Sequence, residues 1–255
     1  GINESINKYS KYEYKKISTV DGEFGIDVVE IDLDNPNLKI ISTAVKPYPT
    51  RSNGQADSGT FGAQSLGEFV LASQAFAGIN ATYFDTGAAR PNYYFFPVYN
   101  SLTGELINED QLKYWTTGPI IAFDENNKFY YFKDSREFVS VASFEEQNNV
   151  KLQAAIGNKP RLIEDGKNLL IEWDIDEKQR NTKAGRNAIA YKDNTIYLVV
   201  ARNATVPNLA NIMKAMQVEY ARNLDGGYSA ALWYNDEYMV RPGRDVANVI
   251  LFSEK

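Results

Sequence analysis

The sequence predicts an α+β fold, in which one domain is built from mixed, largely antiparallel β-sheets with a few helices. Short runs of alternating apolar and polar residues recur along the chain, and clusters of Asn, Asp, Gly and Lys separate them as turns do. Only two stretches have apolar residues at helical spacing. Strands and helices therefore do not alternate in the regular way that builds a parallel sheet.

The first elements are predicted to be a hairpin and a loop. Residues 24–45 alternate apolar and polar positions around the turn Asp34-Asn35-Pro36-Asn37, which indicates a β-hairpin. Residues 46–59 are rich in Pro, Ser, Asn and Gly and are predicted to form a loop. Such a loop serves either as an active-site lid or as a surface excursion.

A helix and a buried strand are predicted next. Residues 60–73 have an imperfect helical spacing of apolar residues after a candidate N-cap at Ser58 or Thr60. The apolar run Ala75–Ile79 then indicates a short buried strand.

The middle and last thirds are predicted to be mostly strands. A hairpin is expected over 117–132 and another over 187–201, each with a turn of Asp, Asn, Glu or Lys at its centre. The second predicted helix has Leu209, Ile212, Met213 and Met216 on one face. The remaining predicted strands are residues 152–156, 161–163, 219–224, 231–235 and 246–252, the last two separated by Asp236-Glu237 and a loop at 240–245.

The residue types that are missing restrict the chemistry. The 255 residues include no His and no Cys, so imidazole bases, Ser-His-Asp and Cys-His nucleophile systems and disulfides are excluded. Carboxylates, Arg, Lys, Tyr, hydroxyls and amides remain. A metal held by such a set would sit on oxygen ligands, which suits calcium or magnesium. We expect no cofactor to be required.

Charge and hydropathy argue against two classes of partner. The formal charge is −6, and Lys and Arg are spread along the chain without a basic run, so nucleic-acid binding is not expected. The longest apolar stretches are far shorter than the roughly 20 residues that span a bilayer. Residues 1–16 lack the apolar region of a signal peptide. The sequence does not specify the oligomeric state.

Five motifs, in order along the chain, resemble those of the phosphodiester glycosidase family. NLDGGYSAAL at 223–232 is similar to the family's NLDGGGSS signature. The others are GINATYFD at 78–85, similar to INGGFFD, AAIGNKPRLIEDGK at 154–167, similar to AIGGGPLLVKDGK, GRNAIAYKDNTIYLVVA at 185–201, similar to the RTAIGV strand pair, and RPGRDVANVIL at 241–251, similar to the closing segment.

This resemblance covers residues 25–252 and implies a mixed α+β fold with its site at the motif loops. It implies a phosphodiester glycosidase-like domain over 23–255, preceded by an N-terminal extension over 1–22. The implied activity is hydrolysis of the glycosidic bond of a sugar 1-phosphodiester, such as N-acetylglucosamine 1-phosphodiester, in a glycan or envelope polymer. Because family members are often exported, the resemblance also implies an extracellular or cell-envelope location.

Several glycines of the family motifs are replaced in this chain. Ala81-Thr82 stands where the family has Gly-Gly, and Tyr228 stands where it has the third Gly of LDGGGSS. Asn187 replaces the Thr of RTAIG. Glycine allows a ligand to approach the backbone closely, so we expect these replacements to reshape the pocket and its substrate preference.

Three carboxylates are candidates for catalysis. Hydrolysis at an anomeric carbon passes through an oxocarbenium-like state that a pair of carboxyl groups ordinarily stabilises. The candidates are Asp225, Asp85 and Asp245. Asp225 follows a buried-looking strand and precedes two glycines, so its alternative role is to cap a glycine turn. Asp85 and Asp245 lie in polar loops, where acidic residues are commonly solvated.

The candidate substrate-binding residues occupy the same motifs. Arginine binds phosphate bidentately, and an Asn amide suits a sugar hydroxyl. The alternatives are surface salt bridges for the arginines and a bond within its own turn for the Asn. A serine without an activating His is expected to bind phosphate instead of acting as a nucleophile. The residues are Asn80, Arg186, Arg241, Arg244, Gly226, Gly227, Tyr228 and Ser229.

Two other functions remain open at this stage. A non-catalytic glycan-binding or sugar-phosphate-binding module could share the fold with an altered pocket, and a nuclease or phosphatase with two metal ions could attack the phosphorus instead. Aromatic residues near two motifs either stack on sugar rings or pack in the core. They are Tyr83, Phe84, Tyr93, Tyr94, Phe95, Phe96 and Tyr228.

Overall fold

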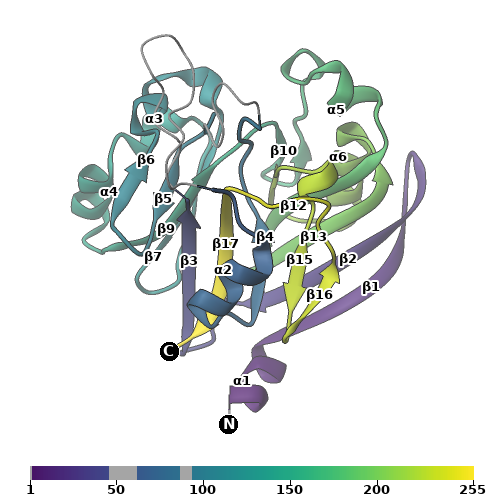
Figure 1. Ribbon diagram of the computed structural model, residues 1–255. Coiled ribbons are helices and arrows are strands. Elements are labelled where there is room, and N and C mark those ends of the chain that lie inside the picture. Colours follow the sequence, from purple (N-terminus) through teal and green to yellow (C-terminus); the bar gives the residue numbers. More distant parts are fainter. Residues whose placement is uncertain (1, 46–61, 87–93) are drawn as a thin grey trace.

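The computed structural model describes residues 2–45, 62–86 and 94–255. These residues form an α+β domain in which all the paired strands of three sheets are antiparallel (Figure 1). The predicted fold class is therefore confirmed. The predicted loop over 46–59 and the candidate N-cap residues Ser58 and Thr60 lie outside the described residues.

The first sheet has seven strands in the order β1-β2-β13-β12-β14-β10-β11. It forms the right-hand part of the molecule in Figure 1. Its strands are β1 (Ser10–Thr19), β2 (Gly22–Asp32), β10 (Arg161–Glu164), β11 (Lys167–Asn168), β12 (Ala184–Lys192), β13 (Thr195–Ala204) and β14 (Tyr220–Asn223).

The second sheet lies at the centre and has the order β16-β15-β4-β17-β3. Its middle strand, β4, pairs with β15 on one side and with β17 on the other. Its strands are β3 (Leu38–Ala44), β4 (Ala77–Asn80), β15 (Leu232–Tyr234), β16 (Glu237–Val240) and β17 (Asn248–Glu254).

The third sheet forms the left-hand part of Figure 1 and has the order β6-β5-β9-β7-β8. The predicted hairpin over 117–132 is confirmed, because β7 pairs with β8. The strands are β5 (Val98–Asn100), β6 (Glu105–Ile107), β7 (Ile120–Asp124), β8 (Phe129–Phe132) and β9 (Leu152–Gly157).

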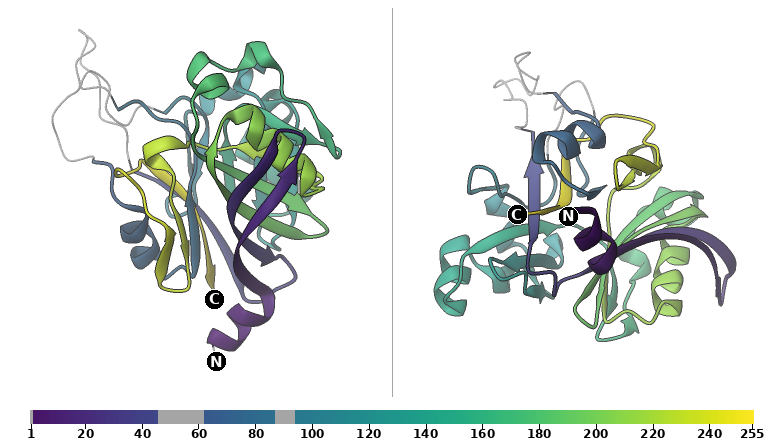
Figure 2. Two further views of the ribbon diagram at one scale, coloured as in Figure 1. Left: turned by 90° about the vertical axis from the view of Figure 1, so that its right-hand side faces the viewer. Right: turned by 90° about the horizontal axis from the view of Figure 1, so that it is seen from below.

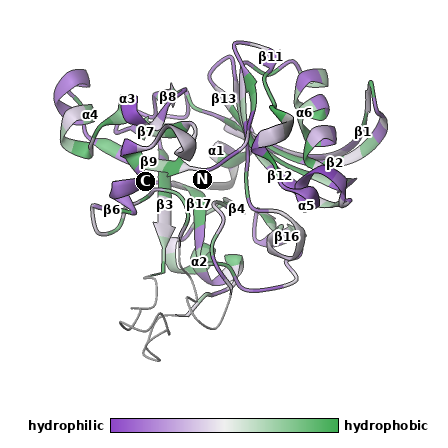
Figure 3. Ribbon diagram, turned by 90° about the horizontal axis from the view of Figure 1, so that it is seen from above, coloured by the Kyte–Doolittle hydropathy of each residue, from purple (hydrophilic) through white to green (hydrophobic). Residues whose placement is uncertain are grey.

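The helices are short and lie outside the sheets, and the picture coloured by hydropathy shows α5 as hydrophilic (Figure 3). In the part of the chain that the structure describes, no helix is long and apolar enough to cross a membrane. The helices are α1 (Ile2–Tyr9), α2 (Leu66–Ser73), α3 (Ser135–Phe138), α4 (Val141–Asn148), α5 (Glu177–Asn181) and α6 (Val206–Ala215), with 3₁₀ turns η1 (Glu109–Lys113), η2 (Trp115–Thr117), η3 (Glu172–Asp174) and η4 (Gly227–Ser229).

The first sheet is buried on both faces because its strands alternate between two cores. On β13, Leu198 and Val200 point to the core shared with the other two sheets. Val199 and Ala201, one residue out of phase, point to the core beneath α6. Successive strand side chains face opposite sides of a sheet, so this apolar run covers both. Figure 2 shows α6 against the outer face of the sheet.

Both predicted helices are present, and capping residues that the apolar spacing did not indicate define where each begins. Ser65, not a residue of 58–60, caps α2, and its hydroxyl accepts from the Glu68 amide while Glu68 bonds back to the Ser65 amide. Thr205 and Asn208 form the same reciprocal arrangement at the start of α6. Such a capping box satisfies two otherwise unpaired amides.

The predicted hairpin over 24–45 is wrong. Its two strands, β2 and β3, belong to different sheets, because both edges of β2 are taken by β1 and β13 while β3 pairs with β17. The turn at 34–37 therefore carries the chain from the first sheet to the second. Residues 10–19, within the proposed N-terminal extension, pair with β2 along the whole of β1.

Candidate active site

A pocket of about 950 Å³ lies where the end of β4, the start of β12 and the end of β14 meet. All five of the motif segments contribute to its wall, together with α5 and the segment after η3. The residues that line it are Tyr83, Phe84, Phe95, Phe96, Lys159, Asp176, Lys178, Gln179, Thr182, Lys183, Ala184, Gly185, Arg186, Asp225, Gly226, Gly227, Tyr228 and Arg244.

Asp225 is the buried carboxyl group of this pocket. It is 5% exposed, and within the described part of the chain its Oδ2 atom has no hydrogen-bond partner. Burial raises the pKa of Asp225 to about 6, although a hydrogen bond from Ser229 and the charges of Arg244 and Arg186 act in the opposite direction. Desolvation of this kind disfavours the charged form of a carboxyl group. The side chain can therefore change its charge within the ordinary range of pH.

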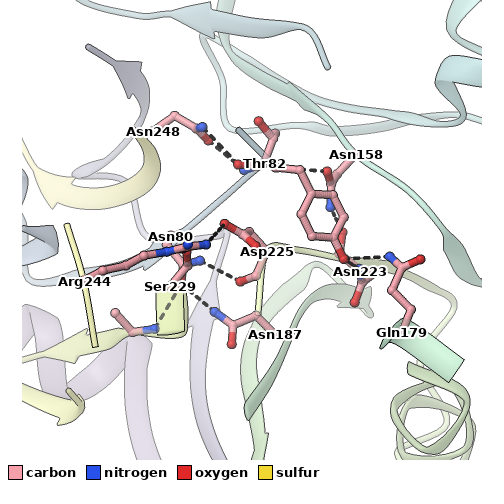
Figure 4. A network of polar contacts seen from close by, with 12 residues as sticks. Asn80, Thr82, Asn158, Gln179, Asn187, Asn223, Asp225, Ser229, Arg244 and Asn248 are labelled. Atoms are coloured by element: carbon pink, nitrogen blue, oxygen red, sulfur yellow. Dashed lines mark hydrogen bonds and ion pairs between the residues drawn. The ribbon is translucent and has the colours of Figure 1, made fainter. Parts of the chain in front are cut away.

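Arg244 brings a positive charge to the carboxylate. Its Nη2 atom lies 3.6 Å from Oδ2 of Asp225, and its Nε donates to Oγ of Ser229 at 2.7 Å (Figure 4). The guanidinium group also lies over the ring of Phe84, 5.4 Å from its centroid. The carboxylate, hydroxyl and ring together orient a cation that is still partly accessible from the pocket.

Asn80 holds the Asp225 backbone in place instead of lining the pocket. Its Nδ2 donates to the carbonyl of Asp225 at 2.7 Å, and its Oδ1 accepts from Nδ2 of Asn187 at 2.6 Å and from the amide of Ala231 at 3.0 Å. The Asp225 amide in turn donates to the carbonyl of Ala81. The structure thus brings Asn80 and Asp225 together as predicted, but it commits the Asn80 amide to the protein.

Tyr83 presents a hydroxyl group whose oxygen already accepts two hydrogen bonds. Nδ2 of Asn223 donates to it at 2.7 Å, and Nε2 of Gln179 at 2.8 Å. Gln179 cannot turn over, because its Oε1 accepts from the Asp176 amide in the capping box of α5. The hydroxyl hydrogen of Tyr83 is therefore left for another acceptor.

The Tyr83 hydroxyl also keeps its proton. Burial, followed by the charge of Asp225, raises its pKa to about 12. The sequence had placed Tyr83 only among the aromatic residues. Its position in the GINATYFD motif, together with Asn223 at the head of NLDGGYSAAL, was the available signal for a polar role.

Arg186 lines the pocket, but backbone carbonyls occupy much of its guanidinium group. Nε donates to Ala204, and Nη2 donates to Lys178 and Thr182. These bonds tie β12 to β13 and to the segment around α5. Desolvation lowers the pKa of Arg186 while the charges of Tyr83, Asp176 and Asp225 raise it. The Arg186 guanidinium group contributes positive charge to the pocket. Because these three hydrogen bonds hold it in place, Arg186 has less of its guanidinium group free for a ligand than Arg244 has.

The two glycines after Asp225 are required by the backbone. A Cβ atom at Gly226 would lie 2.6 Å from the carbonyl oxygen of Gly185, and Gly227 has φ +64°. Tyr228, at the position of the third family glycine, is 77% exposed at the pocket edge. Its bulk therefore narrows the entrance instead of filling the interior.

The structure does not bring the other predicted charges into this pocket. Asp85 is half-buried and Asp245 is exposed, and neither lines it. Arg241 is exposed and lies over the ring of Tyr238. The second carboxylate among the described lining residues is Asp176, whose Oδ1 accepts from the Gln179 amide.

Sequence reasoning also missed several groups of the pocket. Lys159, Lys178 and Lys183 line it and give it an excess of positive charge. Of the aromatic residues named from the sequence, Phe84, Phe95 and Phe96 line the pocket, Tyr94 is buried, and Tyr93 lies outside the described residues. Among the described residues no group of three or more acidic side chains is placed to hold a metal ion.

Comparison with known proteins identifies the family. A model of the family described as phosphodiester glycosidase matches residues 73–253. This match covers most of the chain and includes every wall of the pocket, so the chain belongs to the phosphodiester glycosidase family. No curated protein sequence matches it.

Solved structures share the fold at low sequence identity. A hypothetical protein from Synechocystis has a TM-score of 0.74 at 14% identity, covering 97% of this chain and 62% of that one. The catalytic domain of zebrafish N-acetylglucosamine-1-phosphodiester alpha-N-acetylglucosaminidase, auto-inhibited by its pro-peptide, has a TM-score of 0.69 at 14% identity, with coverage of 96% and 83%. A presumed exported protein from Burkholderia pseudomallei K96243 has a TM-score of 0.53 at 10% identity, with coverage of 91% and 74%.

The pKa of Asp225 predicts how stability changes with pH. Because the folded protein holds this proton more tightly than the unfolded chain, the contribution of Asp225 is full below pH 4 and is lost as pH rises through about 6. Asp225→Asn removes this loss. From pH 4 to pH 7.5, the free energy of unfolding of the wild type should therefore fall by roughly 2–3 kcal/mol relative to that of Asp225→Asn.

Urea unfolding at several pH values measures this difference. The matched control is Asp245→Asn, which changes the same atoms on an exposed side chain. Parallel pH profiles for Asp225→Asn and the wild type would show that Asp225 ionises as it does in the unfolded chain.

Proposed function

We propose that this protein is a hydrolase that cleaves the glycosidic bond of a sugar 1-phosphodiester, such as N-acetylglucosamine 1-phosphodiester, in a glycan or envelope polymer. The observation that carries the proposal is the buried carboxyl group of Asp225 in the pocket wall, whose Oδ2 has no hydrogen-bond partner among the described residues and lies 3.6 Å from the guanidinium group of Arg244. The family of the chain supports the same activity.

The charge of the pocket suits an anionic substrate. The chain carries a formal charge of −6, yet the described lining residues include five cationic side chains and only the carboxylates of Asp176 and Asp225. The five cations are Lys159, Lys178, Lys183, Arg186 and Arg244. A cleft of one charge sign concentrates ligands of the other, and a phosphodiester is negative throughout the ordinary pH range.

The reaction we propose uses Asp225 in its ionised form. A phosphodiester oxygen is already a good leaving group, so little protonation is required of the protein. The carboxylate either attacks the anomeric carbon, forming a glycosyl ester that water then hydrolyses to free sugar, or takes a proton from a water that attacks the carbon directly. In both routes the C–O bond breaks and its electron pair leaves with the phosphate. Arg244 stabilises the phosphate that departs, and Tyr83 donates its hydroxyl hydrogen to a substrate oxygen.

The comparisons support the choice of sugar and location. The zebrafish relative is named for N-acetylglucosamine 1-phosphodiesters, so we place N-acetylglucosamine first among the candidate sugars. The name of the Burkholderia relative marks it as presumed to be exported. We propose an extracellular or cell-envelope location on this basis and on that of the family.

A non-catalytic sugar-phosphate-binding module is the second candidate function. The observation that favours it is the large exposed side chain of Tyr228 at the pocket edge, where the family motif has glycine. Such a protein would bind the same ligands in the same pocket without releasing a product.

Incubation with a panel of sugar 1-phosphodiesters in heavy-oxygen water tests the proposed activity. We expect free sugar carrying the heavy oxygen, and a phosphomonoester without it. Asp225→Asn should lower kcat/KM by roughly 10³-fold or more while the variant stays folded. Heavy oxygen in the phosphate would indicate a phosphoesterase and call for a chelator test, and ligand binding with no product would favour the binding module.

Arg244→Gln tests the charge beside the carboxylate. Arg244 lowers the pKa of Asp225, so its removal should shift the rising limb of the kcat/KM profile to a higher pH than in the wild type and should also raise KM. Arg241→Gln, at an exposed position outside the pocket, is the matched control. If the rising limb of the kcat/KM profile lay at the same pH in Arg244→Gln and in the wild type, Arg244 would have no influence on the ionisation of Asp225.

Tyr83→Phe tests the hydroxyl donor. We expect kcat/KM to fall by about 10²-fold, the typical effect of removing one preorganised donor. Gln179→Leu keeps the hydroxyl and removes one of the two bonds that orient it, so its loss should be smaller. Equal losses in the two variants would assign Tyr83 to support of the pocket wall and not to donation.

A further inference from the structure

Two tryptophans stand exposed side by side, away from the reacting carboxylate. Trp115 in η2 is 55% exposed and Trp173 in η3 is 68% exposed. Their ring centroids are 6.2 Å apart with an interplanar angle of 67°. They come from distant parts of the sequence, and each has a further exposed apolar neighbour in Tyr114 and Ile171. Exposed apolar groups gathered in this way mark interaction sites.

The segments that carry this tryptophan pair, Trp115 and Trp173, meet the pocket at Lys159. Asp174, the residue after Trp173, places its Oδ1 3.5 Å from Nζ of Lys159, and Lys159 lines the pocket. On the other side, a Cβ atom at Gly118 would lie 3.4 Å from Cβ of Lys159. Lys159 therefore contacts the segments that carry both tryptophans and also lines the pocket.

We propose that Trp115 and Trp173 form a second sugar-binding subsite, which stacks on a ring of the glycan chain attached to the phosphodiester. The proposal rests on the proposed function of the pocket. A pyranose ring presents a face of C–H groups that packs against an indole, and Trp provides this area with few torsions to fix. The tilted pair offers one ring face and one ring edge to such a ligand.

The arrangement of charge and apolar surface favours a glycan over a second copy of this chain. A glycan with a phosphodiester presents sugar rings and an anionic group on one molecule, which matches an exposed tryptophan pair whose segments meet a cationic pocket at Lys159. Two indole rings with two neighbouring apolar side chains offer far less than the roughly 800 Å² per partner of a stable protein interface. The substrate that this surface selects is therefore a chain of several sugars, not a single sugar phosphodiester.

Fluorine NMR of protein labelled with 5-fluorotryptophan tests the subsite directly. The chain has three tryptophans, and the third, Trp233, packs against Tyr238 in the second sheet and serves as an internal control. Single Trp→Phe variants assign the signals. The probes are chitotetraose, maltotetraose, cellotetraose and mannotetraose, each titrated into the millimolar range with Asp225→Asn protein so that no turnover occurs.

We expect at least one tetrasaccharide to shift the Trp115 and Trp173 signals and leave Trp233 unchanged. In Trp173→Ala the dissociation constant of that sugar should rise by about fivefold to tenfold, as the loss of one aromatic contact predicts. In the otherwise wild-type protein, Trp173→Ala should lower kcat/KM for a phosphodiester on a tetrasaccharide and leave that for a methyl phosphodiester unchanged.

Three results would overturn the subsite. They are no shift with any of the four sugars, equal shifts of all three signals, and shifts of the Trp115 and Trp173 signals on dilution alone, which would reveal contact between copies. The binding experiment does not depend on catalysis. Sugar-induced shifts in a protein that hydrolyses no phosphodiester would therefore support the subsite and reject the proposed function. Hydrolysis of a phosphodiester without any sugar-induced shift would support the proposed function and reject the subsite.

Discussion

The arrangement of the site depends on one buried amide, the side chain of Asn80. It is 1% exposed and ends β4 of the central sheet, yet its hydrogen bonds reach Asn187 on β12, the carbonyl of Asp225 after β14, and the amide of Ala231. An unpaired amide in such a place would be costly. These bonds therefore fix the relative position of two sheets at the point where the carboxylate is presented.

The third sheet is joined to the same place by similar means. Asn158, after β9, donates to the carbonyl of Asn223 and accepts from the amide of Tyr83. Arg222, fully buried on β14, donates to the carbonyls of Pro119 and Ile156. Side-chain amides and a guanidinium group thus pair with backbone groups at the strand ends, and these bonds join the third sheet to the strand that leads to Asp225.

Local patterns predicted most strands and two hairpins, but not the pairing of strands distant in the sequence. The hairpins over 117–132 and 187–201 were predictable because each turn is short and the strands have no closer competitor. The pairing of β2 with β1 and β13 could not be predicted. One partner, β13, lies more than 150 residues away in the sequence, and the other, β1, is an edge strand whose many polar residues do not resemble a strand pattern. Tertiary pairing overrides local preference in this way.

The same distinction applies to the site. The motifs made Asp225, Gly226, Gly227 and Arg244 candidate site residues, and all four line one pocket of the structure. The hydrogen-bond partners of Asn80 and Arg186 could not be predicted, because the sequence does not distinguish a side chain that binds a ligand from one that bonds to groups of its own chain. Lys178 and Lys183 were missed because they come from a segment outside the motifs, and Lys159 was missed because nothing in its motif distinguishes a lysine that lines the pocket from one on the surface.

The central position of β4 has a consequence for how the protein is made. Its two neighbours, β15 and β17, are formed by residues 232–254, about 150 residues later in the chain. Contacts of such long range are slow to form and keep apolar strands unpaired during synthesis. Until those residues leave the ribosome, the Asn80 strand has no sheet to join and Asp225 has no fixed place. The pocket around Asp225 is therefore completed only after the residues of β15 and β17 have been translated.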